Sequence, residues 1–352
     1  MKSQDSRPDP IYSKRLLNYP IDRMLESGRP DFPFCLCWAN ENWTRAWDGL
    51  DKEVLLKQNY GSEDDKKHIQ WLMTVFQDKQ YIKIGGKPLL LVYRANRFPD
   101  PLRTTSLWRE EARKCGAQEP YLCRVESFSD ERNDPSKIGF DAAVEFQPGW
   151  LKMGTPLRKG NIWRVLRKHG LTSKAFENNN IYDYKAVVAK MLNKPSPPYA
   201  RFPCVTPSWD GSPRRKKDTV ILINSTPGFF GKWLKDTVKA NAQKNAEENI
   251  IFVNAWNEWG EGNHLEPDRR YGRAYLEAVK EALREGGKLW VAETIIIKIL
   301  RLADRLSFLG LKAIKLWQFC KWTGAKLWYS VILPVALFPR NCLRRLYRAI
   351  KK

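Results

Sequence analysis

The stretch NIIFVNAWNEWGEGNHLEPD, residues 249–268, joins a continuous apolar run to a loop that is rich in acids and tryptophans. A run of β-branched and aromatic residues without polar alternation is typical of a parallel strand buried on both faces. The loop then places Glu258 and Glu261 three residues apart. Binding sites in parallel α/β folds gather where the strands end. The stretch therefore predicts a strand that leads into a candidate site.

Five further runs have the same pattern, an apolar segment that ends in polar or aromatic residues. They are PFCLCWA (33–39), PLLLVYR (88–94), PYLCRVE (120–126), DAAVEFQ (141–147) and RFPCVTP (201–207). Helix-like segments are expected at about 20–26, 62–77, 104–115, 183–193 and 226–244. Strands that alternate with helices predict an α/β protein with a parallel sheet.

Polar and aromatic residues follow the predicted strands, which favours a (β/α)8 TIM-barrel type of fold with its site at the carboxyl ends of the strands. They are Glu41, Arg94, Glu126, Gln147, Trp209 and Glu258. A doubly wound sheet is the alternative, but no glycine-rich phosphate loop follows the first strand. Only six of eight barrel strands are recognisable, so we expect an incomplete barrel: either the chain lacks the first two strands or the fold is open.

The composition supports a packed domain followed by a charged tail. Hydrophobic residues make up 43% of the 352 residues, and 15 are tryptophan. The net charge of +22 is uneven, because residues 288–352 hold fourteen Lys/Arg and two acids. We predict a barrel domain at 1–285 and a tail of basic amphipathic helices at 286–352. The tail suits a membrane surface or packing on the barrel, and its longest uncharged run is too short to span a bilayer.

Seven cysteines without a CxxC pair predict free thiols in a reducing compartment. Three histidines without ligand spacing predict no metal site, and nothing in the sequence calls for a cofactor. The first residues, MKSQDSRPDP, do not resemble a signal peptide. We therefore expect a cytoplasmic protein, peripheral on the inner face of the membrane through 288–352. No nucleic-acid motif accompanies the charge, so nucleic acid is not an expected partner.

Paired carboxylates suit the chemistry of glycosidic bonds, in which one protonates the leaving oxygen and the other acts as base or nucleophile. Glu258 and Glu261 are the candidate catalytic pair. The alternative is that both carboxylates cap a helix or pair with Arg269 and Arg270.

Tryptophans and hydrogen-bonding side chains also crowd WANENWTRAWDG (38–49), FQPGW (146–150) and TPSWDGSPRR (206–215). Indole rings stack on sugars, while amides and carboxylates bind hydroxyl groups. Each tryptophan alone is as compatible with a packing role. The candidate substrate-binding residues are Trp38, Asn40, Glu41, Trp43, Trp47, Asp48, Gln147, Trp209, Asp210, Asn257, Trp259 and His264.

Several of these motifs resemble the WbsX-type proteins of bacterial polysaccharide gene clusters, which are similar in their barrel to glycoside hydrolase family 99. They are FPFCLCWANENWTRAWDG, LLKQNYG, KPLLLVYR, VTPSWDGSPRR and NAWNEWGEGNHLEPDRRYGRAYLEA. The resemblance runs from about residue 14 to about residue 281. It implies a (β/α)8 barrel and retaining chemistry through a 1,2-anhydro sugar. Glu258 would then act as base on the 2-hydroxyl, and Glu261 as general acid and later base.

The expected function is glycosyl transfer in O-antigen or capsule synthesis, on a glycan or a lipid-linked oligosaccharide. A retaining endo-type glycoside hydrolase is the first alternative. A non-catalytic fragment that binds glycan, or needs a partner chain to supply the missing strands, is the second.

Overall fold

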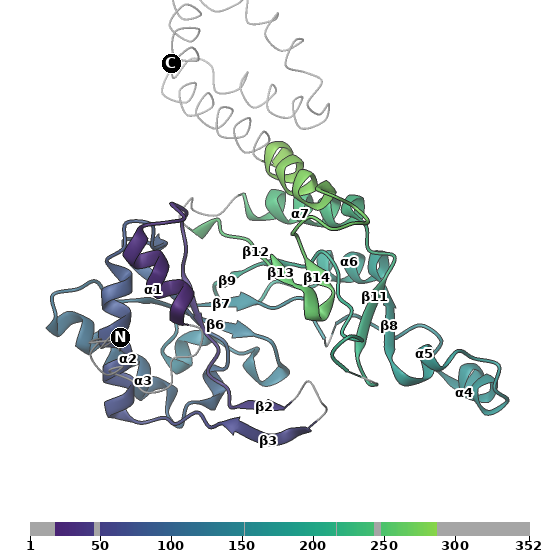
Figure 1. The fold of residues 1–352 in the computed structure, drawn as a ribbon, viewed down its shortest axis with the longest axis horizontal. Coiled ribbons are helices and arrows are strands. Elements are labelled where there is room, and N and C mark those ends of the chain that lie inside the picture. The colour runs from purple at the N-terminus through teal and green to yellow at the C-terminus, as the bar shows by residue number, and fades with distance from the viewer. Residues whose placement is uncertain (1–17, 46–49, 151, 216, 243–247, 287–352) are drawn as a thin grey trace, which may run out of the picture. The chain divides into compact units, whose positions relative to one another are not determined.

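The computed structural model describes residues 18–45, 50–150, 152–215, 217–242 and 248–286 (Figure 1). Its parallel strands follow one another in the order of the sequence. β1, β5, β6, β7 and β9 pair in this order, and β10 pairs with β12. Their bounds are Leu36–Trp38, Lys87–Val92, Tyr121–Glu126, Ala142–Glu145, Arg201–Phe202, Cys204–Val205 and Phe252–Val253.

Only Pro203 separates β9 from β10, so residues 201–205 occupy one strand position between β7 and β12. The Phe252 amide donates to the Pro203 carbonyl at 2.9 Å, which keeps the ladder continuous past the proline. All six predicted runs therefore contain parallel strands, and the α/β class with a parallel sheet is confirmed.

The runs are continuously apolar because alternate residues face two different hydrophobic clusters. Leu90 and Leu122 pack with α2 (Ser62–Phe76) and α3 (Pro101–Lys114) on one face of the sheet. Leu89, Leu91 and Cys123 belong to the cluster on the opposite face. A strand buried on both faces needs an apolar residue at each position.

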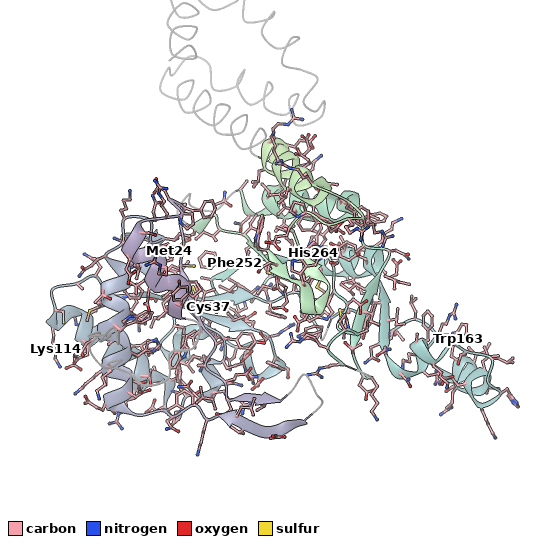
Figure 2. All side chains as sticks on the ribbon, viewed as in Figure 1. Met24, Cys37, Lys114, Trp163, Phe252 and His264 are labelled. Atoms are coloured by element: carbon pink, nitrogen blue, oxygen red, sulfur yellow. The ribbon has the colours of Figure 1, made fainter. Side chains whose placement is uncertain are left out.

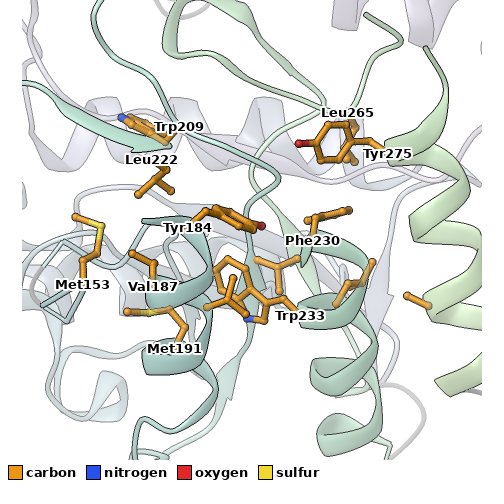
Figure 3. Close-up of a cluster of buried hydrophobic side chains, with 14 of the residues drawn as sticks. Met153, Tyr184, Val187, Met191, Trp209, Leu222, Phe230, Trp233, Leu265 and Tyr275 are labelled. Carbon is orange, nitrogen blue, oxygen red and sulfur yellow. The ribbon is translucent and has the colours of Figure 1, made fainter. Parts of the chain in front are cut away.

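A further hydrophobic cluster lies around α6 (Tyr184–Leu192), α7 (Pro227–Asn241) and the helical residues 274–286. Figure 3 shows Tyr184 and Phe230 near Trp233 at its centre, and all three side chains are buried. This cluster fixes the helices beside the strands that lead to residues 206–210 and 254–266.

Side-chain caps start several of these helices where the sequence suggested. Thr226 accepts a hydrogen bond from the Phe229 amide, and Pro227 occupies the first turn of α7. In α2 the helix begins at Ser62, but the cap position is Gly61 and no side chain caps it. Acids in its first turn complement the helix dipole instead.

Several short elements were not predicted. β2 (Trp43–Arg45) pairs with β3 (Leu50–Leu56), and β8 pairs in parallel with β11. Helices α4 and α5 precede β8, and β13 forms a hairpin with β14. The remaining bounds are α1 Asn18–Ser27, β4 Lys83–Ile84, α4 Asn161–Lys168, α5 Lys174–Asn178, β8 Asn180–Asp183, β11 Val220–Ile223, β13 Asn257–Glu258 and β14 Asn263–His264.

The expected (β/α)8 type of barrel, which the sequence predicts to be incomplete, is not confirmed. Within the described ranges no pairing joins β12 to β1, so the sheet is open there. Closing a sheet requires enough strands, tilted and staggered, to bring its two edges together. The tail predicted from residue 286 lies, from residue 287 on, outside the described residues. None of the described helices is long and apolar enough to cross a membrane.

Candidate functional site

The two candidate catalytic glutamates lie on one small hairpin beyond β12. Residues 257–258 pair antiparallel with residues 263–264, and a single turn of 3-10 helix, Trp259–Glu261, connects them. Gly262 ends this turn with φ +55, and a Cβ atom there would lie 3.0 Å from the Cβ of Asp210. The tight turn brings both carboxylates to the same end of the hairpin.

Arg214 pairs with both carboxylates. Its Nη1 atom lies 2.7 Å from Oε1 of Glu261 and 3.8 Å from Oε1 of Glu258. The two oxygen atoms are therefore no further apart than the sum of these distances. Two carboxylates that share one guanidinium are close enough to act on the same glycosidic bond.

The two glutamates differ in their surroundings. The side chain of Glu261 is 25% exposed and that of Glu258 is 46% exposed. Burial raises the pKa of the Glu261 carboxyl above its ordinary value, Arg214 opposes this shift, and the charge of Glu258 adds to it. A raised pKa favours the protonated form, which is the form that a general acid requires.

The indole of Trp259 is held in place beside this pair. It stacks on the His264 ring, with centroids 3.7 Å apart, and its Nε1 donates to Glu266 at 2.7 Å. The Nε2 atom of His264 lies 3.2 Å from Asp268. Trp259 remains half exposed, as does Trp256 two residues before Glu258. Glu266 thus supports the tryptophan and does not extend the carboxylate pair.

The loop after β10 docks onto the hairpin. The Asp210 amide donates to the Glu261 carbonyl at 2.7 Å, and the Thr206 hydroxyl donates to Asn263 at 3.0 Å. Trp209, predicted to bind substrate, is buried at 6% exposure in the cluster of Figure 3 and meets Trp150 edge to face. Its position supports the loop that carries Arg214.

A second polar group lies at the carboxyl ends of β1, β5 and β6. Asn40 is fully buried and exchanges two hydrogen bonds with the Arg94 backbone, at 2.8 and 2.9 Å. The Arg94 guanidinium bonds Glu131 at 2.8 Å and the half-exposed Glu41 at 2.6 Å, and it lies over the Phe128 ring. Asn40 therefore joins two strand ends, while Glu41 can reach a ligand.

A series of aromatic rings links the two polar groups. Tyr93 contacts Phe146, Phe146 contacts Trp150, and Trp150 contacts Trp209, with centroids 5.0–6.2 Å apart. Gln147 is fully buried, and its side-chain oxygen accepts from the Gly149 amide at 2.8 Å. Its carbonyl accepts from Asn254 at 2.7 Å, which ties the end of β7 to the segment after β12.

The structure thus brings Glu258, Glu261, Asn257, Trp259, His264 and Asp210 together, and it brings Asn40 and Glu41 together with Arg94. Trp38 packs among Tyr60, His68, Phe98 and Trp108. Trp47 and Asp48 lie outside the described residues, as does the side chain of Trp43. Figure 2 labels His264 on the hairpin that carries the glutamates and Phe252 in β12.

Sequence reasoning missed Arg214 and Arg94 as site residues. Both stand in motifs that drew attention, yet the sequence alone offered Arg269 and Arg270 as partners of the glutamates. Only the approach of the loop after β10 selects Arg214. No group of three His, Cys, Asp or Glu in the described part of the chain could hold a metal ion.

The fold and site define a parallel α/β protein with a carboxylate pair and exposed indoles beyond the carboxyl ends of its strands. The sequence profile of the family described as "Glycosyltransferase WbsX" matches residues 11–279. The chain belongs to this family.

Two curated relatives are both described as "Uncharacterized protein WxcX", from Xanthomonas campestris pv. campestris strains B100 and ATCC 33913. Each is 39% identical over 273 residues, which is 77% of this chain and 37% of the relative. The chain thus spans well under half the length of these relatives.

Solved structures with a similar outline include a "Glycoside hydrolase-like protein", with a TM-score of 0.41, 14% identity and coverage of 62% of this chain and 60% of that chain. Another is the GH99 endo-alpha-mannosidase from Bacteroides thetaiotaomicron, with a TM-score of 0.39, 13% identity and coverage of 67% and 63%.

Proposed function

We propose that this chain is a glycosyl-processing enzyme of bacterial surface polysaccharide synthesis, O-antigen or capsule, that acts by glycosyl transfer. The observation that carries the proposal is the pair Glu258 and Glu261, held on one hairpin by a shared arginine beside two half-exposed tryptophans. Membership of the WbsX family supports the same class of reaction.

The resemblance to family 99 supplies a mechanism in which each carboxylate has one role at a time. Glu258 takes the proton of the sugar 2-hydroxyl, O2 closes on C1, and the glycosidic C1–O bond breaks. Glu261 gives its proton to the leaving oxygen. An acceptor hydroxyl then attacks C1 and loses its proton to Glu261, while Glu258 returns a proton to O2. Water in place of the acceptor would make the same site a hydrolase.

The test replaces each glutamate by glutamine in a strain that depends on this gene for its surface polysaccharide. We expect E258Q and E261Q each to reduce the glycan product by at least about 100-fold, because general acid–base groups contribute 10²–10⁴-fold. E277Q, on the exposed face of helix 274–286, is the control and should leave the product unchanged. Circular dichroism should show that all three variants fold.

R214M belongs in the same experiment, since it removes the cation that both carboxylates share. Arg214 opposes the raised pKa of Glu261, so its loss should move the alkaline limb of activity to higher pH. Normal polysaccharide in both glutamine variants would contradict the catalytic assignment.

A non-catalytic role as a glycan-binding or assembly component is the second candidate. It is favoured by the open sheet, in which β1 and β12 are partly buried and unpaired on their outer edges within the described residues. A partner chain that supplies further strands would then complete the site. Glycan turnover by the purified chain alone would rule out this role.

A further inference from the structure

The segment between β7 and β8 carries a short helix that buries none of its residues. We name residues 157–178, with α4 and α5, the basic arm. In Figure 1 the two helices project beyond β8 and β11. α4 has no buried residue, and Ile162, Val165 and Leu171 are 70%, 55% and 69% exposed. A helix of a soluble domain ordinarily turns such an apolar face toward the core.

The exposed apolar face of α4 has a defined orientation, because contacts within the arm fix the other face of the helix. The Arg158 guanidinium lies over the Phe176 ring at 4.2 Å and toward Trp163 at 5.5 Å. Arg167 donates to the Arg158 carbonyl at 3.2 Å. Figure 2 shows Trp163 within the arm. The side of α4 that carries Trp163 makes these contacts within the arm. Ile162 and Val165 are three residues apart and therefore share the side that faces solvent.

The basic arm is strongly positive. Residues 157–178 contain six basic residues and one acid, Glu177; the basic residues are Arg158, Lys159, Arg164, Arg167, Lys168 and Lys174. In the described chain, no salt bridge uses a cation of α4; Arg164 donates to the neutral Asn161 side chain at 2.8 Å. Without an acidic partner in the described chain, Arg164 and Lys168 are available to an anionic partner.

We propose that the basic arm binds the surface of an anionic phospholipid bilayer. Ile162, Val165 and Leu171 would enter the boundary between headgroups and acyl chains, while Arg164 and Lys168 contact lipid phosphates. Exposed apolar side chains on a projecting arm suit a deformable lipid surface. The proposal is independent of the catalytic assignment and concerns residues other than 288–352.

The experiment measures hydrogen–deuterium exchange of the full chain with and without vesicles. An equal mixture of phosphatidylcholine and phosphatidylglycerol should slow exchange in the peptides that cover 157–174. Vesicles of phosphatidylcholine alone should not, because the arm's cations need anionic headgroups. This readout locates the contact even if another part of the chain also binds the vesicles.

In a triple variant, I162S/V165S/L171S, vesicles at the same lipid concentration should no longer slow exchange in the arm. At least about tenfold more lipid should be needed to restore the protection, since each substitution removes apolar area that lipid would bury. L102S/L192S, which changes two exposed leucines outside the arm, should retain the protection. Exchange in 157–174 that is unchanged by anionic vesicles would overturn the proposal. So would equal protection of the triple variant, or protection of the arm by nucleic acid but not by lipid.

Discussion

Single arginines organise the charges at the ends of the strands. Arg94 is buried between Glu131 and Glu41, and its removal would leave the buried carboxylate of Glu131 without its cation. Breaking a buried pair on one side costs several kcal/mol, because the remaining charge stays desolvated. Arg214 is more exposed, and its effect falls on the protonation of Glu261 more than on stability.

His68 is a residue whose burial makes stability depend on pH. It packs edge-on against Trp38 and Trp108, and burial lowers its pKa from 6.5 to about 3. The unfolded chain binds a proton below its pKa of 6.5 while the folded chain does not. The free energy of unfolding should therefore fall as pH drops from 6.5 toward 3.

We expect H68L to remove this contribution. Between about pH 6.5 and about pH 5, wild type should lose roughly 1.6 kcal/mol more stability than H68L, because the slope approaches about 1.4 kcal/mol per pH unit only below the unfolded pKa. Urea unfolding at both pH values measures the difference. Parallel losses in the two proteins would mean that His68 already binds its proton in the folded chain.

At the level of elements, short side chains fix where helices begin and which strands they join. Asp183 ends β8 and caps α6 by accepting from the Ala186 amide at 3.0 Å. Its other oxygen accepts from Asn224, just after β11, at 2.8 Å. One carboxylate thus holds a helix start and a strand pair together.

D183A should lower the free energy of unfolding by about 1–2 kcal/mol, because it removes the cap and frees the Asn224 amide. D183N keeps an oxygen for the cap and should lose less than half as much. Urea titration of the three proteins provides the comparison. Equal losses in both variants would show that charge, and not the capping acceptor, carries the effect.

At the level of the whole molecule, the open sheet predicts a gradient of local stability. β5, β6 and β7 have strand partners on both sides and are almost wholly buried. β1 and β12 are only partly buried, and each has one strand partner in the described chain. Local opening costs less where fewer buried contacts break.

Amide exchange should therefore be slowest in β5–β7 and faster in β1 and β12, by about tenfold for each 1.4 kcal/mol by which local stability is lower. Mass spectrometry of peptides from the native chain measures this order. If the amides of β1 and β12 were as well protected as those of β5–β7, a further part of the protein or a partner would have to cover the two edges.

The sequence by itself determined the six parallel strands, the main helices and the position of Glu258 and Glu261 just after a strand. Burial on both faces requires continuous apolar runs, and chain order became spatial order because helices cross from one parallel strand to the next. The caps at Asp183 and Thr226 are equally local signals.

Only the tertiary structure decided which cation serves the glutamates, which tryptophans are buried and whether the sheet closes. Arg214 and Glu261 are 47 residues apart, and nothing local distinguishes Arg214 from Arg269 as a partner. Trp209 and Trp259 stand in similar motifs, yet one is buried and the other half exposed. These outcomes depend on how distant loops pack together, which residue patterns along one segment do not encode.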